Sequence, residues 1–124
     1  MNWIEQYKAK LSTPEEAVSL VKSGNKIFIS GNAATPFVLI NALAARKNEL
    51  EDVEVNHVLL LGDDPLSKPG MENHFRHNSL FVGPADRDAI NEGRSDYVPA
   101  FIFEIPSFFT QRLISLDFAH VHLS

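Results

Sequence analysis

The sequence predicts an α/β fold in which a mostly parallel sheet carries helices on its faces. Three observations predict it. Apolar, β-favouring runs alternate along the chain with segments of helical spacing. Small or turn-forming residues separate these segments. The run at 53–61 ends in a continuous apolar stretch, which is typical of a strand buried on both faces of a parallel sheet.

The composition sets the size and class of the protein. Its 124 residues are enough for one domain with a core and too few for two ordinary ones. The net charge is −5, and the basic residues form no stripe, so nucleic acid is a disfavoured partner. There is no cysteine, which excludes a disulfide scaffold and a thiolate zinc site. Without a signal-like or membrane-spanning apolar run, we expect a cytoplasmic location and no membrane partner.

The first half of the chain predicts three helices and two strands. Residues 1–11 suggest a short amphipathic helix or arm with Trp3, Ile4 and Tyr7 on its apolar side. A hydroxyl cap, a proline and two acids at 12–16 predict a second helix that ends at Gly24. Its buried stripe is predicted to be Ala17, Val18, Leu20 and Val21. A strand at 26–30, a helix from Thr35 to Leu50 and a strand at 53–61 follow.

The second half predicts shorter elements. They are a loop at 66–76, a strand at 78–83, a helix at 86–92 that ends at Gly93, a brief strand at 97–98, a helix at 103–113 and a last strand at 116–123. A parallel strand is normally followed by a covering helix. Since none follows here, we expect a longer natural polypeptide or a partner chain that completes the fold.

The most promising candidate site is the strand–loop–helix connection at 27–43. Gly31, Ala33 and Ala34 are small enough for a ligand to approach the backbone, and the amides at the helix start could face an anion or an oxyanion. Asn32 adds a side-chain donor and acceptor. A plain strand-to-helix turn explains the same residues equally well. The loop lacks the further glycines of a dinucleotide fingerprint and the lysine of a P-loop.

Two other groups of polar residues have structural explanations. The pair Asp63 and Asp64 could act as acid and base or bind Mg²⁺, but a turn closed by aspartate and Pro65 is the favoured interpretation. The polar segment 91–97 is interpreted as a helix cap with an exposed ion pair. No Gly-x-Ser-x-Gly pattern supports a serine hydrolase.

Four histidines occur in two pairs of close spacing. They are His74 with His77 and His120 with His122. Either pair could hold zinc, but no third ligand is evident from spacing, so we predict no metal site. For the first pair we favour an ordered hydrogen-bonding loop near the ligand edge, and for the second an interface with a following domain.

Several segments, taken together and in order, resemble the acetyl-CoA hydrolase/transferase family, and especially its 4-hydroxybutyrate CoA-transferase branch. They span nearly the whole chain. The similar segments are 12–18, 30–36, 42–46 with 49–53, 74–83, 90–99, 103–106 and 116–124. The segment Gly83–Arg87 departs from the Gly-x-Asn-x-Arg form associated with the family, so we expect no assured ligand contact there.

The resemblance implies an N-terminal domain, residues 1–124, of a longer two-domain enzyme. In that family a glutamate of the second domain attacks an acyl-CoA thioester, and a glutamyl-CoA intermediate follows. A short carboxylic acid such as acetate, butyrate or 4-hydroxybutyrate then accepts CoA. The glutamate's segment has no counterpart here, so this chain is expected to hold no catalytic residue and to be inactive alone. None of its glutamates is assigned that role: Glu51, Glu54, Glu72, Glu92 and Glu104.

The resemblance also implies a substrate-binding wall. Gly31, Asn32, Ala33 and Ala34 would face the acyl group or its oxyanion, and Leu61 and Gly62 would line the neighbouring edge. CoA and acyl-CoA would be substrates, with no permanently bound cofactor, and the full-length enzyme is expected to be a homo-oligomer. An acyl-CoA hydrolase, a non-catalytic module for a phosphorylated ligand, and an interaction subunit completed by another polypeptide remain alternatives.

Overall fold

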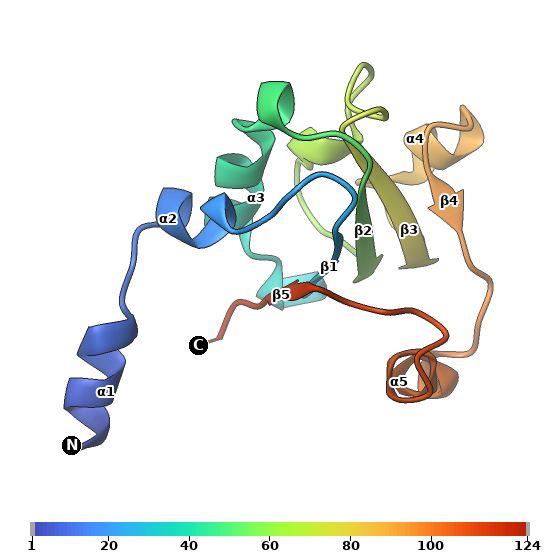
Figure 1. Cartoon of the computed structure of the whole chain (residues 1–124). Coiled ribbons are helices and arrows are strands. Elements are labelled where there is room, and N and C mark those ends of the chain that lie inside the picture. The colour runs from blue at the N-terminus through green and yellow to red at the C-terminus, as the bar shows by residue number, and fades with distance from the viewer. Residues whose placement is uncertain (1, 124) are drawn as a thin grey trace.

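A five-stranded parallel sheet forms the centre of the molecule (Figure 1), as the computed structural model describes it for residues 2–123. The strand order is β4-β3-β2-β1-β5, and every pair of neighbours is parallel. The predicted fold class is therefore confirmed. The strands are β1 (Lys26–Ile29), β2 (Val53–Val58), β3 (Phe75–Phe81), β4 (Asp96–Tyr97) and β5 (Phe118–His120).

Helices and short 3-10 turns connect the strands. The α-helices are α1 (Trp3–Lys10), α2 (Pro14–Ser19), α3 (Phe37–Ala44), α4 (Arg87–Asn91) and α5 (Ile105–Thr110). The 3-10 helices are η1 (Asn32–Ala34), η2 (Lys47–Glu49), η3 (Pro65–Ser67) and η4 (Ile102–Glu104). In the described part of the chain, every helix is too short or too polar to traverse a lipid bilayer.

The core lies between one face of the sheet and the helices α2 and α3. Alternate strand residues point into it, as the two-residue period of a strand requires. The strands contribute Ile27, Ile29, Val53, Val55 and Phe75, and the helices contribute Val18, Ile40 and Leu43. On the opposite face Phe28 meets Phe109 of α5 edge to face, with ring centroids 5.6 Å apart. Helices are thus present on both faces, as expected, although the contact of α5 with the sheet is much smaller than that of α2 and α3.

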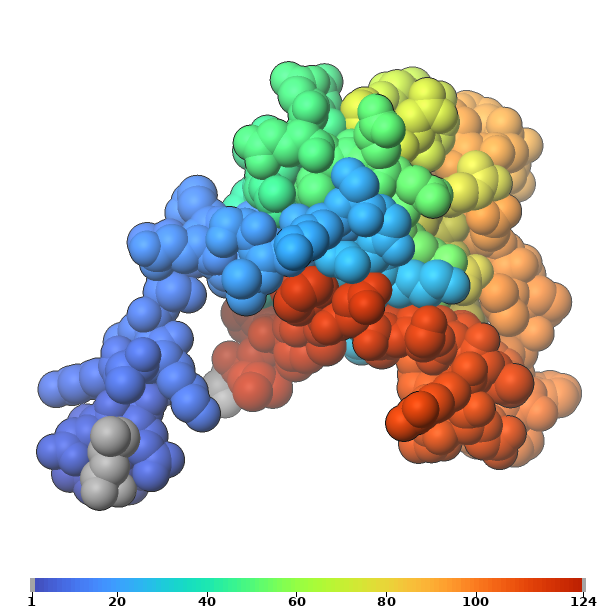
Figure 2. All heavy atoms as spheres, in the orientation of Figure 1, coloured from blue at the N-terminus to red at the C-terminus, as the bar shows by residue number. Residues whose placement is uncertain are grey.

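Helix α1 stands away from the rest of the molecule (Figures 1 and 2). A capping box starts it, since the side chains of Asn2 and Glu5 each bind the other's backbone amide. The predicted helix at the N-terminus is confirmed, but none of its residues is buried. Its apolar side chains Trp3 and Tyr7 are exposed.

The second helix is shorter than its pattern predicts. It ends at Ser19 rather than near Gly24, and Leu20 is 61% exposed, so the prediction that Leu20 belongs to the buried stripe is wrong. The stripe holds for Val18 and Val21, which are fully buried. Where the helix stops, the amide of Val21 donates to the carbonyl of Val18 three residues back, and the Arg46 side chain donates to the carbonyls of both residues.

Replacing Arg46 by alanine is expected to destabilise the fold by about 2 kcal/mol. The substitution removes a charged donor from two carbonyls at the end of α2. Urea unfolding followed by circular dichroism measures the change. The exposed neighbour Lys47→Ala is the matched control and should be nearly neutral. An equal loss in both variants would show that Arg46 acts only through local helix propensity.

The ends of several strands also differ from their predicted positions. Strand β2 stops at Val58 because the register shifts between His57 and Val58 and Leu59 takes a left-handed backbone with φ +48°. Strand β3 begins at Phe75, inside the predicted loop, because that aromatic side chain is buried in the core. The third predicted helix ends at Ala44 and resumes as η2, and β5 is limited to 118–120.

Candidate functional site

The connection between β1 and α3 lies at the carboxyl ends of the strands, packed against the end of β2. At Gly31 a Cβ atom would lie 1.8 Å from the carbonyl oxygen of Val58 and 2.9 Å from that of Leu59. No side chain fits in that space. Glycine is therefore required by the close approach of the chain's own backbone, as in the plain strand-to-helix turn that the sequence left open as an alternative.

Asn32 turns the loop. Its φ is +55°, a left-handed conformation that asparagine adopts more readily than most residues. Its amide donates to the carbonyl of Leu59 at 2.7 Å, which joins the loop to the end of β2. Its side chain is exposed and forms no hydrogen bond with residues 2–123. That side-chain amide is therefore available to a ligand.

Three amides near the start of α3 are already occupied. Those of Ala34, Thr35 and Phe37 donate to the carbonyls of Gly31, Asn32 and Thr35 respectively. Thr35, where the predicted helix begins, is not its N-cap: its hydroxyl donates to the carbonyl of Asn32 at 2.7 Å, and the N-cap is Pro36 without a side-chain bond. These three amides therefore do not face an anion, because the loop's own carbonyls accept from them.

A cavity of about 360 Å³ opens beside Gly31 and Asn32. Val58, Leu59, Phe81 and Ile102 complete its lining, so its walls are apolar apart from the backbone and the asparagine. A second cavity of about 510 Å³ shares Phe81 and Ile102 with it and extends toward β4. Its other lining residues are Leu80, Val82, Tyr97, Ala100, Phe101 and Phe103. Because they share these two residues, the two cavities form one apolar surface that begins at Gly31 and Asn32.

Of the six predicted binding residues, only Gly31 and Asn32 line that first cavity. Leu61 lies beside the loop, with its amide 3.4 Å from the Thr35 hydroxyl, but does not line the cavity. Gly62, with φ +83°, packs under the ring of Phe37 and lines a different cavity. Ala33 and Ala34 belong to η1 and line neither hollow.

The segment 62–65 is a turn, as favoured. The Asp64 side chain accepts from the amide of Leu66 at 3.0 Å, and Pro65 opens η3. Asp63 is exposed and pairs with Lys68. The two carboxylates therefore point to different environments and do not form a shared acid–base or Mg²⁺ pair.

The histidines do not pair as their spacing suggested. His74 lies at the amino end of β3 with its Nδ1 2.8 Å from the carbonyl of Leu50, whereas His77 is fully buried within the strand. His120 is buried and its neighbour His122 is exposed. Over residues 2–123 no three side chains of ligating type converge on a point where a metal could bind.

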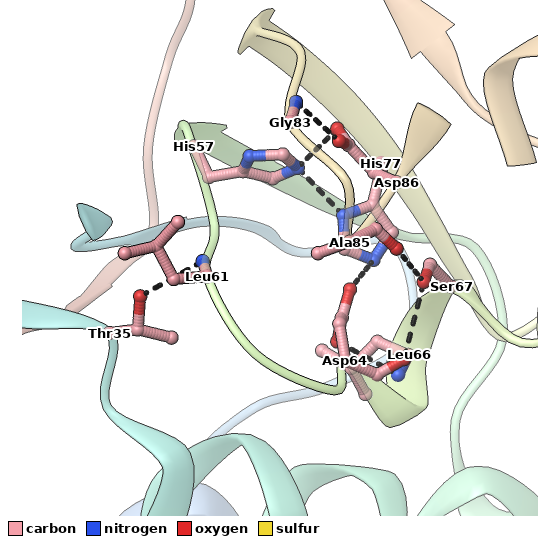
Figure 3. Close-up of polar contacts among 10 residues, drawn as sticks. All are labelled: Thr35, His57, Leu61, Asp64, Leu66, Ser67, His77, Gly83, Ala85 and Asp86. Carbon is pink, nitrogen blue, oxygen red and sulfur yellow. Dashed lines mark hydrogen bonds and ion pairs between the residues drawn. The ribbon is translucent and has the colours of Figure 1, made fainter. Parts of the chain in front are cut away.

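Sequence patterns gave no sign of the polar cluster that forms behind the site (Figure 3). His57 of β2 and His77 of β3 are 20 positions apart, yet Nε2 of His57 lies 2.8 Å from Nδ1 of His77. Nε2 of His77 is 3.2 Å from a carboxylate oxygen of Asp64, and Nε2 of His57 is 3.5 Å from one of Asp86. All four side chains are at most 4% exposed. Only the register of two neighbouring strands could have revealed them.

Burial governs the ionisation of this cluster. It lowers the pKa of His57 well below its usual value, an effect to which the nearby His77 adds. Burial also lowers the pKa of His77, against the opposing influence of Asp64 and Asp86. Burial raises the pKa of Asp64, although His77 and the hydrogen bonds from Leu66 and Ser67 oppose it. Both imidazoles are therefore neutral at neutral pH.

Comparison with known proteins defines the class. The whole chain, residues 1–124, matches the acetyl-CoA hydrolase/transferase N-terminal domain. The chain therefore belongs to the acetyl-CoA hydrolase/transferase family, as the resemblance predicted. It is 40% identical over 124 residues to the 4-hydroxybutyrate coenzyme A transferase of Clostridium kluyveri. It is 38% identical over 115 residues to a succinyl-CoA:acetate/propanoyl-CoA:succinate CoA transferase of Fasciola hepatica.

Solved structures show the same fold. RipA from Yersinia pestis superposes with a TM-score of 0.87 at 28% identity over 98% of this chain. A 4-hydroxybutyrate CoA-transferase from Porphyromonas gingivalis superposes with a TM-score of 0.73 at 26% identity over 97% of this chain. The chain spans only 29% of the Clostridium kluyveri enzyme and 24% of the Fasciola hepatica enzyme. Most of each relative thus lies outside the region that this chain matches.

Proposed function

We propose that residues 1–124 form the N-terminal domain of a CoA-transferase that moves CoA between an acyl-CoA and a short carboxylic acid. The observation that carries the proposal is the apolar cavity beside Gly31 and Asn32, in a chain whose relatives are CoA transferases. An apolar hollow with one free amide side chain suits an acyl group whose carbonyl needs a hydrogen-bond donor.

The attacking carboxylate is supplied from outside this chain. The residues that line the cavity include no acid, and covalent transfer through a glutamyl-CoA thioester needs one within reach of the thioester carbonyl. A second, glutamate-bearing domain supplies it, and the chain alone has no activity. CoA is a substrate here and not a resident cofactor. The cytoplasmic location and homo-oligomeric state stay predictions.

The exposed aromatic residues support a further domain. Phe101 is 69% exposed and Phe103 is 81% exposed, on the same surface as the second cavity. Large apolar side chains gathered at a cavity mark a surface that is covered in the complete protein. Because the relatives are more than three times as long as the matched region, the remaining polypeptide is the proposed cover.

Hydrolysis of the acyl-CoA is the alternative within the same family, and it depends on whether water reaches the intermediate. A phosphate-binding module is less well supported. Four amides of the loop and the helix start, those of Asn32, Ala34, Thr35 and Phe37, already donate to backbone carbonyls, which leaves fewer donors for a phosphate.

The proposal is tested with a chimera in which this chain replaces the matching region of the Clostridium kluyveri enzyme. We expect the chimera to exchange CoA between an acyl-CoA and acetate, butyrate or 4-hydroxybutyrate, and the isolated chain to show no exchange. A folded chimera that only releases free CoA would identify a hydrolase. A folded chimera with neither activity would contradict the proposal.

In that chimera Asn32→Gly is expected to lower kcat by on the order of a hundredfold, as loss of a donor to a developing oxyanion does. Glycine keeps the left-handed backbone and removes only the side chain. The control is Ala33→Gly, which loosens the same loop without removing a donor. Equal rates in the two variants would mean that Asn32 serves only the turn.

A further inference from the structure

In the buried cluster behind the cavity, the hydrogen bond between His57 and His77 can run in either of two directions. His57 and His77 share one hydrogen bond of 2.8 Å, and burial lowers the pKa of both, which favours the neutral form of each ring. In a neutral imidazole one nitrogen donates and the other accepts. Hence the nitrogen that carries the proton on one ring determines which nitrogen carries it on the other. The pair therefore has two possible combinations of tautomers, called its two arrangements below.

The surrounding carboxylates favour one arrangement. Asp64 places a carboxylate oxygen 3.2 Å from Nε2 of His77, at ion-pair distance although not aligned for a hydrogen bond, and this favours a proton on that nitrogen. Nδ1 of His77 must then accept, so Nε2 of His57 donates to it. Asp86, 3.5 Å from the same Nε2 of His57, favours the same proton position.

Each arrangement leaves one buried N–H without a hydrogen bond. Nδ1 of His57 and Nε2 of His77 are both buried and form no hydrogen bond with residues 2–123. The favoured arrangement places the N–H at Nε2 of His77, beside the carboxylate of Asp64, whereas the opposite one places it at Nδ1 of His57. The carboxylate at ion-pair distance therefore decides between the two arrangements.

The cluster is joined to the cavity at both ends. His57 immediately precedes Val58 and Leu59, which line the cavity and contact Gly31. At the other end, Asp86 accepts from the amide of Gly83 at 3.0 Å. Gly83 in turn packs against the side chain of Leu59, since a Cβ there would lie 2.7 Å from its Cδ1. Leu59 is therefore held from two sides, and its carbonyl receives the amide of Asn32.

We propose that Asp64 is a positioning residue: it sets the tautomers of His77 and His57, and the resulting network fixes Leu59 and, through it, the turn at Asn32. The significance for acyl binding rests on the proposed function above, whereas the network itself does not. Other charged groups near it are His120, one strand beyond β1, and Asp88, Glu92 and Arg94 at the rim of the cavity that Asp64 lines.

The test is Asp64→Asn in the isolated chain, read by two-bond ¹⁵N–¹H correlation spectra of the histidines. In the parent we expect both His57 and His77 to carry the proton on Nε2. An asparagine can keep its oxygen toward the amide of Leu66 and turn its NH₂ to His77. His77 then accepts at Nε2, and both rings change to the Nδ1–H form.

Amide hydrogen exchange reads the consequence at the loop. Exchange of the Asn32 amide is expected to become about tenfold faster in Asp64→Asn, because its acceptor is less firmly held. The exposed neighbour Asp63→Asn is the control and should match the parent in tautomers and exchange. A parent His77 with its proton on Nδ1, or unchanged tautomers in Asp64→Asn, would refute the network. Changed tautomers with unchanged Asn32 exchange would refute positioning.

A second variant, His57→Gln, tests the same assignment if Asp64→Asn does not fold. His57→Gln keeps an N–H donor near the position of Nε2, so His77 should stay protonated on Nε2. A His77 that moves its proton to Nδ1 in this variant would overturn the assignment. None of these measurements involves CoA, so an inactive chimera with the expected tautomers would refute the proposed function alone.

Discussion

Gly31→Ala is expected to lower the free energy of unfolding by about 3 kcal/mol or more. The added Cβ would lie 1.8 Å from the carbonyl oxygen of Val58, and both that atom and the next nearest, the oxygen of Leu59, belong to the backbone. A backbone cannot rotate aside as a side chain does, so β1 and β2 must separate at their carboxyl ends. The shift would also lengthen the 2.7 Å bond from the Asn32 amide to Leu59.

Thermal unfolding followed by circular dichroism measures this effect, and the expected decrease in Tm is roughly 10 °C or more. Gly24→Ala is the informative control. Its φ is +78° and a Cβ there meets nothing within 4 Å, so the cost is limited to backbone strain of about 1 kcal/mol. If Gly31→Ala is no worse than Gly24→Ala, then the end of β2 yields easily and the cavity is not rigid.

Acidification below about pH 6.5 is expected to destabilise the fold steeply. Burial lowers the pKa of His57 and of His77, so the unfolded chain binds protons in this range that the folded chain does not. Stability is then full above the unfolded pKa and is lost as the pH falls toward the folded values. Each histidine contributes a slope of about 1.4 kcal/mol per pH unit, so the pair contributes roughly 2.7.

Two other groups modify the slope. Burial lowers the pKa of His120, so this residue also destabilises the fold as the pH falls. Burial raises the pKa of Asp64, so its protonation favours the folded state as the pH falls and opposes the histidines at more acidic pH. The loss should therefore steepen as the pH falls through about 6.5, where the unfolded imidazoles gain protons, and should weaken where Asp64 is protonated.

Urea unfolding at a series of pH values from 7.5 to about 5 tests this expectation. His57→Gln should reduce the slope by the contribution of one histidine, about 1.4 kcal/mol per pH unit. The same substitution at the exposed His122 should leave the slope unchanged. A free energy of unfolding that is flat across this range would show that the folded and unfolded chains bind equal numbers of protons, and would contradict the lowered pKa of the two imidazoles.

The fold could be predicted largely from local patterns. Strands at 26–30 and 53–61, a helix opened by Pro14 and a helix end at Gly93 all depend on residues close in sequence, and the structure confirms these elements in type. Their ends differ where a distant residue intervenes. Arg46 binds the carbonyls where α2 ends early, and the register shift after His57 ends β2.

The site could be predicted only in part. The loop residues Gly31 and Asn32 line a cavity, but the reason for Gly31 is the approach of β2, which no local pattern shows. The roles of Phe81 and Ile102, and the contact of His57 with His77, arise from pairing between strands that are far apart in sequence. Local spacing instead suggested His74 with His77, which the structure separates.

The position of β5 has a consequence for how the molecule assembles. Strand β5 pairs with β1 at the edge opposite β4 (Figure 1). The segment between β4 and β5 passes the cavity at Ile102 and then crosses the face of the sheet on which Phe109 meets Phe28. The amide of Lys26 is bound by Asp117, 91 positions later. Contacts of such long sequence separation have a high loop-closure cost and tend to form late in folding. We therefore expect the crossing segment, which brings Ile102 to the cavity, to dock last and to be the first to detach under partial denaturation.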